Sequence, residues 1–404
     1  MREDGRREGA AALSRREFLK SSGGAAALLL WGCGSNEPLA LEEGRLAGSG
    51  LPDPFARGRF LGELPFVGEG TFPSGVRRKE GLDGRYALDL SKLDSLTVAN
   101  EDFFIRTFPP AQLPPAEGWT VRVRGLVRRP ADVGIDRIRS WARPLGKTLM
   151  ECAGNGPPVH YGLIGSAEWT GVPFAELLSL AEIEPAAGRV LVSGFDGNPP
   201  RSKTSAPGAA WVFGIDELTE AGAFLAVGMN GEQLSVDHGA PVRLMVPGWY
   251  GCVCVKWLDG IEFVGDDQPA TSQMREFALR THQEGVPRLA RDYLPAVVDR
   301  TAAPVRAERW RLDGEEAVRV VGLTWGASVS PGRLGVSFAS EEPLQPVSAC
   351  PPLTGRDWAF WSHRWKPPQQ GIHRIRLGLL DSDAPARRLE IPVYGRKVEV
   401  PAFA

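Results

Sequence analysis

The alternation of apolar and polar residues predicts many short strands and few helices. Residues 119–127, WTVRVRGLV, alternate with the period of two that is typical of a half-buried strand. Residues 190–195 and 242–246 are compact apolar runs of strand length, and Pro247-Gly248 ends the second run. These segments indicate a fold in which sheets build most of the core.

One segment has the period of a helix instead. Residues 173–183 place apolar side chains three and four positions apart, which predicts a short amphipathic helix. Pro173 suits the first helical position because its missing N–H would be unpaired there, and Pro185 ends the helix. We therefore expect an α+β fold that is strand-rich.

The pattern changes after a connector, residues 286–304, that is rich in proline and arginine. Beyond it, four segments alternate as short strands: residues 315–325, 333–339, 371–380 and 387–400. They predict an antiparallel β-sandwich of immunoglobulin-like size over residues 300–404. Five tryptophans are expected to fill this sandwich or to cover an interface: Trp310, Trp325, Trp358, Trp361 and Trp365.

Composition and charge exclude nucleic acid as the main expected partner. The 404 residues are 43% hydrophobic, enough to bury large cores in two or three domains. The formal net charge of -2 provides no basic surplus for nucleic acid or an acidic membrane surface. The cysteines are not spaced as a disulfide framework or a tetrahedral zinc site; they are Cys33, Cys152, Cys252, Cys254 and Cys350.

Residues 1–46 are predicted to form an export signal and a tether. SRREFLK at 14–20, followed by the apolar run 23–31, resembles a twin-arginine signal whose apolar run is too short to span a bilayer as a mature helix. Because this route exports folded proteins, we expect a prosthetic group acquired beforehand and a periplasmic or cell-envelope location. Cys33 is a possible lipid anchor, although Trp31 is bulky for such a site.

Cys152 lies in the segment TLMECAGNGPPVHYG, residues 148–162. A thiolate binds soft metals and is also a nucleophile when its pKa is lowered, while a lone cysteine is most often simply buried. The glycines and prolines predict a rigid loop, a place where a ligand can be presented to a cofactor. From the residues alone, a core thiol, a metal ligand and a thiol hydrolase using Cys152 with His160 all remain open.

Four blocks of sequence resemble the sulfite oxidase family of molybdopterin enzymes. They are NEDFFIR at 100–106, ECAGNG at 151–156, AEWTGVPFAELL at 167–178 and MNGEQLSVDHGAPVRLMVPGWYGCVCVKWLDGIE at 229–262. The resemblance implies a molybdopterin-binding catalytic domain over residues 47–286. It also implies that the β-rich tail is an immunoglobulin-like dimerisation domain, and hence a homodimer.

The resemblance assigns Cys152 to molybdenum. In this family one cysteine thiolate binds the metal, which also carries two sulfurs of a single pterin dithiolene, and Arg106 belongs to the catalytic site. The pterin phosphate and ring need fixed positive charge and hydrogen-bonding groups. The positions that match cofactor-binding residues of the family are Phe104, Arg106, Thr107, Cys152, Asp196, His238, Arg243, Cys254, Val255 and Lys256.

The other cysteines fit this interpretation in different ways. Cys252 and Cys254 form a Cys-x-Cys whose side chains would share one face of a strand. They could clamp a thiophilic metal or line the pterin pocket. Cys350 is expected to be a residue of the sandwich.

The chain departs from the family pattern around the substrate. Gly156 and Pro157 stand where sulfite-oxidising members carry basic residues, and residues 202–206, SKTSA, offer no active-site tyrosine. Thr107-Phe108 replaces the usual Asn-His. These losses weaken the recognition of a charged substrate and place sulfite itself in doubt.

Other residues near these positions could compensate. Arg201 or Lys203 would supply positive charge, and Tyr161 or His160, just past the cysteine loop, would replace the missing tyrosine as proton donor. This catalytic role of Tyr161 is a hypothesis. It would be removed if Tyr161→Phe kept full turnover with full molybdenum loading.

These observations predict an exported oxidoreductase that moves an oxygen atom between water and a small sulfur compound. No Cys-x-x-Cys-His haem motif occurs, so two electrons would pass to a separate acceptor such as a cytochrome. A reductase of a sulfoxide is one alternative. A catalytically inactive scaffold or binding protein that retains the fold is another.

Overall fold

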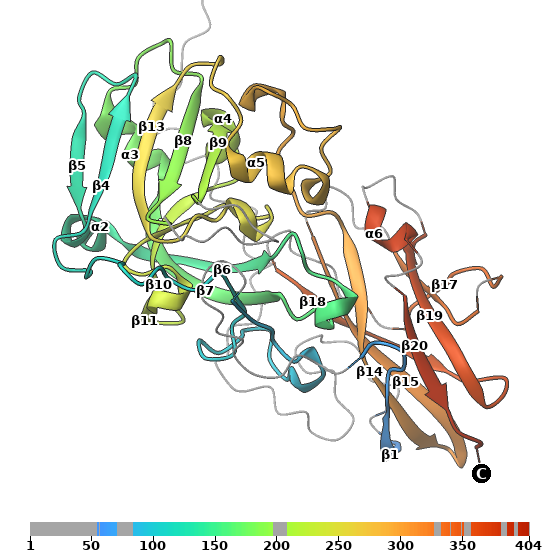
Figure 1. Ribbon diagram of the computed structural model, residues 1–404. Helices are drawn as coiled ribbons and strands as arrows, with labels where there is room; N and C mark the ends of the chain where they lie inside the picture. Colours follow the sequence, from blue (N-terminus) through green and yellow to red (C-terminus); the bar gives the residue numbers. More distant parts are fainter. Residues whose placement is uncertain are drawn as a thin grey trace, which may run out of the picture. The chain divides into compact units, whose positions relative to one another are not determined.

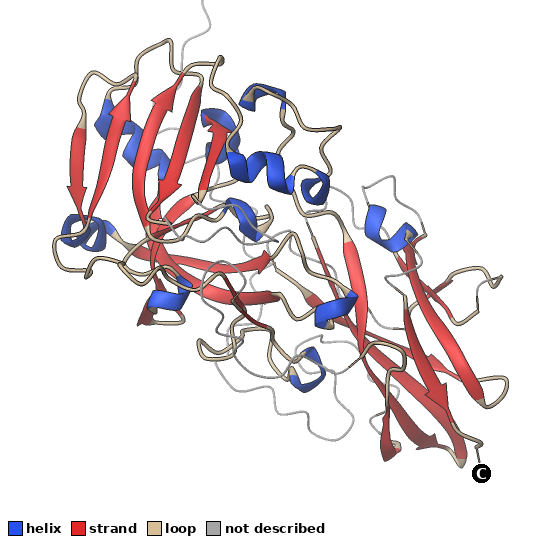
Figure 2. Cartoon of the chain, viewed as in Figure 1, coloured by secondary structure: helices blue, strands red, loops and turns tan. Residues whose placement is uncertain are grey.

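The structure, a computed structural model, describes residues 55, 57–70, 84–196, 208–326, 333–339, 341–348, 350, 357–380, 386–391 and 395–403. The predicted export signal and Cys33 lie outside these residues, as do Arg201, Lys203 and the segment 202–206. Strands dominate the described chain, and the helices between them are short (Figure 2). This confirms the strand-rich α+β prediction.

The sheet that carries Cys152 consists of strands β6, β7, β10, β11 and β12. Their bounds are Arg143–Glu151, Ile164–Pro173, Phe224–Met229, Glu232–Gln233 and Arg243–Met245. The order is β11-β10-β7-β6, β12 also pairs with β10, and all the pairs are antiparallel. Because β10 is buried along its whole length, this sheet lies deep in the core and provides a rigid base for the loops at its ends.

A second five-stranded sheet has the order β5-β4-β13-β8-β9 (Figure 1). The strands are β4 (Thr120–Gly125), β5 (Ala131–Gly134), β8 (Arg189–Gly194), β9 (Ala210–Gly214) and β13 (Leu258–Val264). Its one parallel pair is β4 with β13. In β4 the side chains alternate between exposed and buried, as the sequence predicts. Both sheets contribute to one continuous hydrophobic core.

Short helices and a small ladder complete this part of the fold. The helices are α2 (Ile135–Trp141), α3 (Phe174–Ala181), α4 (Ile215–Glu220) and α5 (Ser272–Phe277), and β2 (Arg85–Tyr86) pairs with β3 (Ile105–Arg106). The predicted helix at 173–183 is α3. Pro173 is its N-cap rather than its first residue, because the proline still belongs to β7. In the described chain no helix is both long and apolar enough to cross a bilayer.

The C-terminal strands form two four-stranded antiparallel sheets, β1-β14-β15-β18 and β17-β16-β19-β20. The strands are β1 (Arg59–Leu64), β14 (Thr301–Leu312), β15 (Glu315–Trp325), β16 (Leu334–Ser337), β17 (Gln345–Pro346), β18 (Ala359–Trp365), β19 (Gly371–Leu379) and β20 (Arg396–Val400). Side chains of both sheets share one hydrophobic core, so the predicted β-sandwich is present. Cys350 packs against this core, as expected.

Three features of the sandwich differ from the sequence prediction. Its edge strand β1 comes from the N-terminal side of the chain and pairs with β14. The connector ends before Thr301, and Pro304 lies inside β14 where the register shifts, a position at which a strand tolerates proline. The predicted strand at 387–400 is wrong in its first part, because residues Arg387–Glu390 form the helical turn α6 before β20 begins.

The five tryptophans are all buried, as predicted, but in different places. Trp361 and Trp365 fill the sandwich core, and Trp310 packs with Phe55. Trp325 and Trp358 instead belong to the core of the two five-stranded sheets. They therefore join the sandwich to the sheet that carries Cys152.

Candidate functional site

Cys152 begins the loop that connects β6 to β7. The loop is closed by hydrogen bonds: the Cys152 N–H donates to the Leu163 carbonyl at 2.9 Å, and the Asn155 N–H donates to the Cys152 carbonyl at 2.9 Å. The Asn155 side chain also accepts from the Leu163 N–H at 3.0 Å. The Gly154 N–H donates to the Cys152 sulfur at 3.4 Å. The predicted rigid loop is thus present and fixes the direction of the thiol.

A cleft enclosing about 810 Å³, including its opening to solvent, lies at this loop. All ten positions matched from the family line it: Phe104, Arg106, Thr107, Cys152, Asp196, His238, Arg243, Cys254, Val255 and Lys256. They come from segments as far apart as 104–107 and 254–256. The structure therefore brings together every cofactor-binding residue that the sequence suggested.

The thiol of Cys152 is buried, and its pKa is raised by that burial. The nearby positive charges of Arg106 and Arg280 oppose the rise, as does the hydrogen bond from Gly154. Sequence reasoning missed Arg280. Its guanidinium lies 5.2 Å from the ring centre of Phe277, which lines the cleft.

Arg243 ties together three segments below the cleft. Its guanidinium donates to the His238 carbonyl at 2.8 Å and to the Cys254 carbonyl at 3.0 Å, and it contacts the Met150 sulfur at 3.5 Å. Burial lowers the pKa of Arg243 to about 10. The side chain remains charged at neutral pH, so the cleft contains a buried cation whose hydrogen-bond acceptors are neutral.

Lys256 is a second cation with neutral acceptors. Its side chain is half-buried. Nζ donates to the Thr107 carbonyl and to the Asp237 carbonyl, the latter at 2.9 Å. Burial of the amine, followed by the charge of Arg243, lowers the pKa of Lys256 to about 7. A bound anion would reverse this effect. The site is therefore prepared for negative charge.

His238 is a neutral hydrogen-bonding residue of the cleft. Its Nε2 lies 3.2 Å from the Phe103 carbonyl, and Nδ1 lies 2.8 Å from the Ser235 hydroxyl. Because a carbonyl only accepts, Nε2 carries the proton and Nδ1 accepts from Ser235. Burial lowers the pKa of His238 to about 4, so the ring stays uncharged at neutral pH.

Cys252 and Cys254 both line the cleft, but the strand predicted for them is wrong. Residues Gly251–Val253 form a 3₁₀ turn, in which the Cys254 N–H donates to the Gly251 carbonyl. Gln273 of α5 holds this turn, because its amide donates to the Cys252 carbonyl at 2.7 Å. Of the two roles left open by the sequence, lining of the pocket is the one that the structure supports.

Tyr161 and His160 are not among the residues that line the cleft. The Tyr161 ring is buried, with the guanidinium of Arg396 at 6.0 Å from its centre. His160 Nδ1 lies 3.8 Å from the Glu69 carboxylate. This placement does not support either residue as the proton donor, and it does not support a hydrolase that pairs Cys152 with His160.

Several lining residues had no signal in the sequence. Met150, Gln273 and Phe277 reach the cleft from β6 and α5. The apolar run before Cys152 marks Met150 only as a core residue, and no motif surrounds α5. Only the packing of α5 beside the Cys252 turn reveals its part in the site.

Comparison with known proteins agrees with this geometry. Residues 108–272 match the family described as oxidoreductase molybdopterin binding domain. Sulfite oxidase from Gallus gallus is 30% identical over 195 residues, which are 44% of this chain and 42% of that protein. Sulfite oxidase from Arabidopsis thaliana is 28% identical over 182 residues, 40% of this chain and 46% of that protein. This part of the chain therefore carries an oxidoreductase molybdopterin binding domain and is similar to sulfite oxidases.

Two further comparisons define how far this similarity extends. Nitrate reductase from Beauveria bassiana is 33% identical over 161 residues, which cover 37% of this chain and 18% of that protein. The chain thus spans less than half the length of these curated relatives. The sulfane dehydrogenase SoxCD from Paracoccus pantotrophus has a similar structure, with a TM-score of 0.61 and 18% identity over 83% of this chain and 90% of that one. At this identity, the similarity shows the shared fold.

The residues present fit the molybdenum cofactor of the family. Cys152 offers a soft sulfur ligand at the cleft, and Arg243 and Lys256 offer buried positive charge whose hydrogen-bond acceptors are neutral. A single pyranopterin dithiolene carries both a metal and a phosphate. Cys152 would hold the metal end, and the two cations would face the phosphate end.

Proposed function

We propose that this protein is an exported molybdopterin oxidoreductase of the sulfite oxidase type, which moves an oxygen atom between water and a small sulfur compound. The observation that carries the proposal is the opening of the Cys152 thiol onto the same cleft as Arg243 and Lys256. Thiolate is a ligand of soft transition metals, and paired cations bind phosphate. One cleft that offers both fits a cofactor with a metal at one end and a phosphate at the other.

When bound, the cofactor would supply the two-electron redox chemistry. In the oxidising direction the substrate gains one oxygen from water, while two protons and two electrons leave. The electrons pass to a separate acceptor such as a cytochrome. The protein's own residues shape the site: Cys152 would hold the metal, neutral His238 fixes the Phe103 carbonyl, and Arg243 joins the segments of His238 and Cys254.

A small anionic sulfur compound is the substrate class that the cleft supports best. Gly156 and Pro157 have replaced the basic residues of sulfite-oxidising members, but Arg106 and Arg280 both exert positive charge on the Cys152 sulfur. Arg280, in another segment and beside Phe277, therefore supplies compensating positive charge. The similar structure is that of a sulfane dehydrogenase, which is consistent with a sulfur substrate. Neutral sulfoxides are the alternative.

The location and assembly of the protein form part of the same proposal. The twin-arginine pattern at 14–20 supports export to the periplasm or cell envelope after the cofactor is inserted, and Cys33 offers a site for lipid attachment. The C-terminal sandwich resembles in its two-sheet build the immunoglobulin-like domains that pair subunits. A homodimer formed through this sandwich is what we infer.

The test is metal analysis of the natively matured protein together with dye-coupled turnover. We expect equimolar molybdenum, and turnover with sulfite or thiosulfate but not with neutral sulfoxides. Cys152→Ser should lose turnover by about a thousandfold or more because the metal loses its protein ligand. Cys350→Ser, which changes a thiol of the sandwich, is the matched control. A folded, metal-free wild-type protein would instead identify a scaffold, and reduction of sulfoxides alone would reverse the proposed direction.

A further inference from the structure

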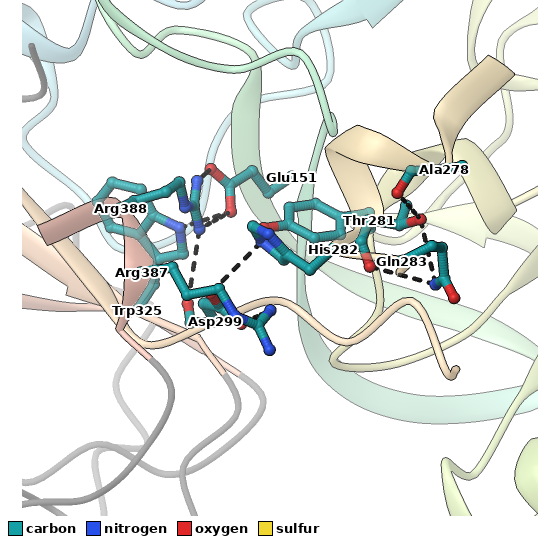
Figure 3. Close-up of polar contacts among 10 residues, drawn as sticks. Glu151, Ala278, Thr281, His282, Gln283, Asp299, Trp325, Arg387 and Arg388 are labelled. Carbon is teal, nitrogen blue, oxygen red and sulfur yellow. Dashed lines mark hydrogen bonds and ion pairs between the residues drawn. The ribbon is translucent and has the colours of Figure 1, made fainter. Parts of the chain in front are cut away.

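The carboxylate of Glu151 lies directly before the proposed molybdenum ligand and is completely buried. It is the last residue of β6, paired with Ile164 of β7. Its side chain turns away from the cleft toward the β-sandwich, where Figure 3 shows it in contact with Arg388 and Trp325. A charged residue in this position needs partners, because an unpaired buried charge is very costly.

The sandwich supplies those partners. Arg388 of α6 donates to both carboxylate oxygens of Glu151: Nη1 donates to Oε1, and Nη2 donates to Oε2 at 3.0 Å. The Trp325 indole, at the end of β15, donates to Oε2 at 2.8 Å. These residues lie 237 and 174 positions away in the chain. A bidentate pair of this kind fixes orientation as well as distance.

Glu151 also joins the cysteine loop itself. Asn155 donates its amide to Glu151 Oε1 at 3.1 Å, and the same side chain accepts from the Leu163 N–H. The carboxylate therefore connects the sandwich to a side chain that closes the loop. A shift of Arg388 would be transmitted to both ends of the loop that starts at Cys152.

The same guanidinium supports the opposite wall of the cleft. Arg388 lies 5.6 Å from the ring centre of Tyr250, which precedes the turn that carries Gly251 and Cys252. A Cβ atom on Gly251 would come within 3.2 Å of the Glu151 carbonyl oxygen, so the two segments pack closely. Tyr250 in turn contacts His282, which lies 3.4 Å from the Asp299 carboxylate (Figure 3).

We propose that Glu151 and Arg388 are positioning residues, through which the β-sandwich sets the direction of the Cys152 sulfur. Buried ion pairs contribute little net stability compared with packed apolar residues, but they define geometry. The inference goes beyond the proposed function, because it concerns how the protein holds this sulfur whatever the substrate. It rests on the proposed function only where the bound metal is used as a probe.

The first experiment measures how fast Cys152 is alkylated in the full chain produced without cofactor, by mass spectrometry of its peptide. Glu151→Gln and Arg388→Met should each raise the rate by about tenfold or more, because the loop opens more readily. Cys350 in the sandwich is the internal reference. The matched control is Lys147→Met, which breaks another ion pair between β6 and the sandwich, Lys147 to Asp357 at 3.6 Å, and should leave the Cys152 rate unchanged.

Further variants separate positioning from folding. The double variant Glu151→Met with Arg388→Met restores apolar packing, so it should regain stability while Cys152 remains fast to react. Trp325→Phe removes one hydrogen bond to Glu151 and should raise the alkylation rate of Cys152 by a smaller factor. This variant tests the proposal if the charge variants do not fold. The proposal is overturned if folded variants alkylate at the wild-type rate, or if Lys147→Met raises the rate equally.

The loaded enzyme offers a second readout. Electron paramagnetic resonance g values report the ligand geometry of a metal, so we expect those of the partly reduced enzyme to shift in Arg388→Met and to stay fixed in Lys147→Met. In Arg388→Met, kcat should fall while KM changes little, because Arg106 and Arg280, the residues proposed to attract an anionic substrate, are unchanged. Unchanged g values at full metal loading would contradict the proposal. Absence of metal in the wild type would refute the proposed function instead, and the alkylation result would still stand.

Discussion

Two groups of charged residues flank Cys152, and they differ in how their charge is balanced. Behind the loop, the Glu151 carboxylate is matched by Arg388 inside the protein. In the cleft, the acceptors of Arg243 and Lys256 in the described chain are backbone carbonyls and the Met150 sulfur. The first group is complete without a ligand. The acceptors of the second group are neutral, and Asp196 and Asp237 act on Lys256 through their charge without offsetting the effect of burial, so we expect this group to favour a bound anion.

The largest expected difference between the two groups is in stability. Arg388→Met leaves a buried carboxylate without its cation, and we expect a loss of about 3–5 kcal/mol in the free energy of unfolding of the cofactor-free chain. Lys256→Met removes an amine whose charge is disfavoured by burial, so it should cost much less stability than Arg388→Met or increase stability. Urea unfolding of both variants makes the comparison. Equal losses would show that the two groups do not differ in this way.

The second prediction concerns the pH dependence of anion binding in the cleft. Lys256 has a folded pKa of about 7 against an ordinary value of 10.5, so the folded cofactor-free protein binds fewer protons than the unfolded chain between these values. Stability therefore rises with pH across this window. Bound sulfate would favour the charged amine, so its affinity should fall by up to about tenfold per pH unit above pH 7.

Calorimetry with sulfate measures this directly, because the charge of sulfate is constant across the window. Binding should also take up protons, which titration in buffers of different ionisation enthalpy detects. Lys256→Met is expected to bind weakly and without this pH dependence. If the wild type binds sulfate equally at pH 6 and pH 9, Lys256 is not part of the anion site.

The smallest effect is expected at Arg280, which lies beside Phe277 of the cleft. Arg280 is exposed, and its charge acts on substrate partly through water. Arg280→Ala should raise KM for an anionic substrate by about threefold to tenfold with little change in kcat, and high salt should weaken the difference. Arg275→Ala is the control, because it changes an exposed arginine of α5, just before the 3₁₀ turn Leu279–Thr281 that carries Arg280. If only kcat falls, Arg280 does not act in substrate binding and the prediction is wrong.

The sequence by itself determined the local parts of this protein. Alternation predicted β4 and the sandwich strands, and helical spacing predicted α3, because these periods reflect which side of an element faces the core. The glycines and prolines around Cys152 predicted a loop that presents a thiol. Through their resemblance to the sulfite oxidase family, the blocks around Arg106, Arg243 and Lys256 indicated candidate cofactor residues, and the structure places these residues around one cleft.

Only the tertiary structure decided what lies next to these parts. A strand period in residues 387–390 gave no sign of the turn α6, which places Arg388 against Glu151 across 237 positions of the chain. No local sequence pattern predicts that Arg280 lies beside Phe277 or that Tyr161 is not among the residues that line the cleft. Periodicity records burial, whereas the partner of a buried charge depends on which distant segments pack together.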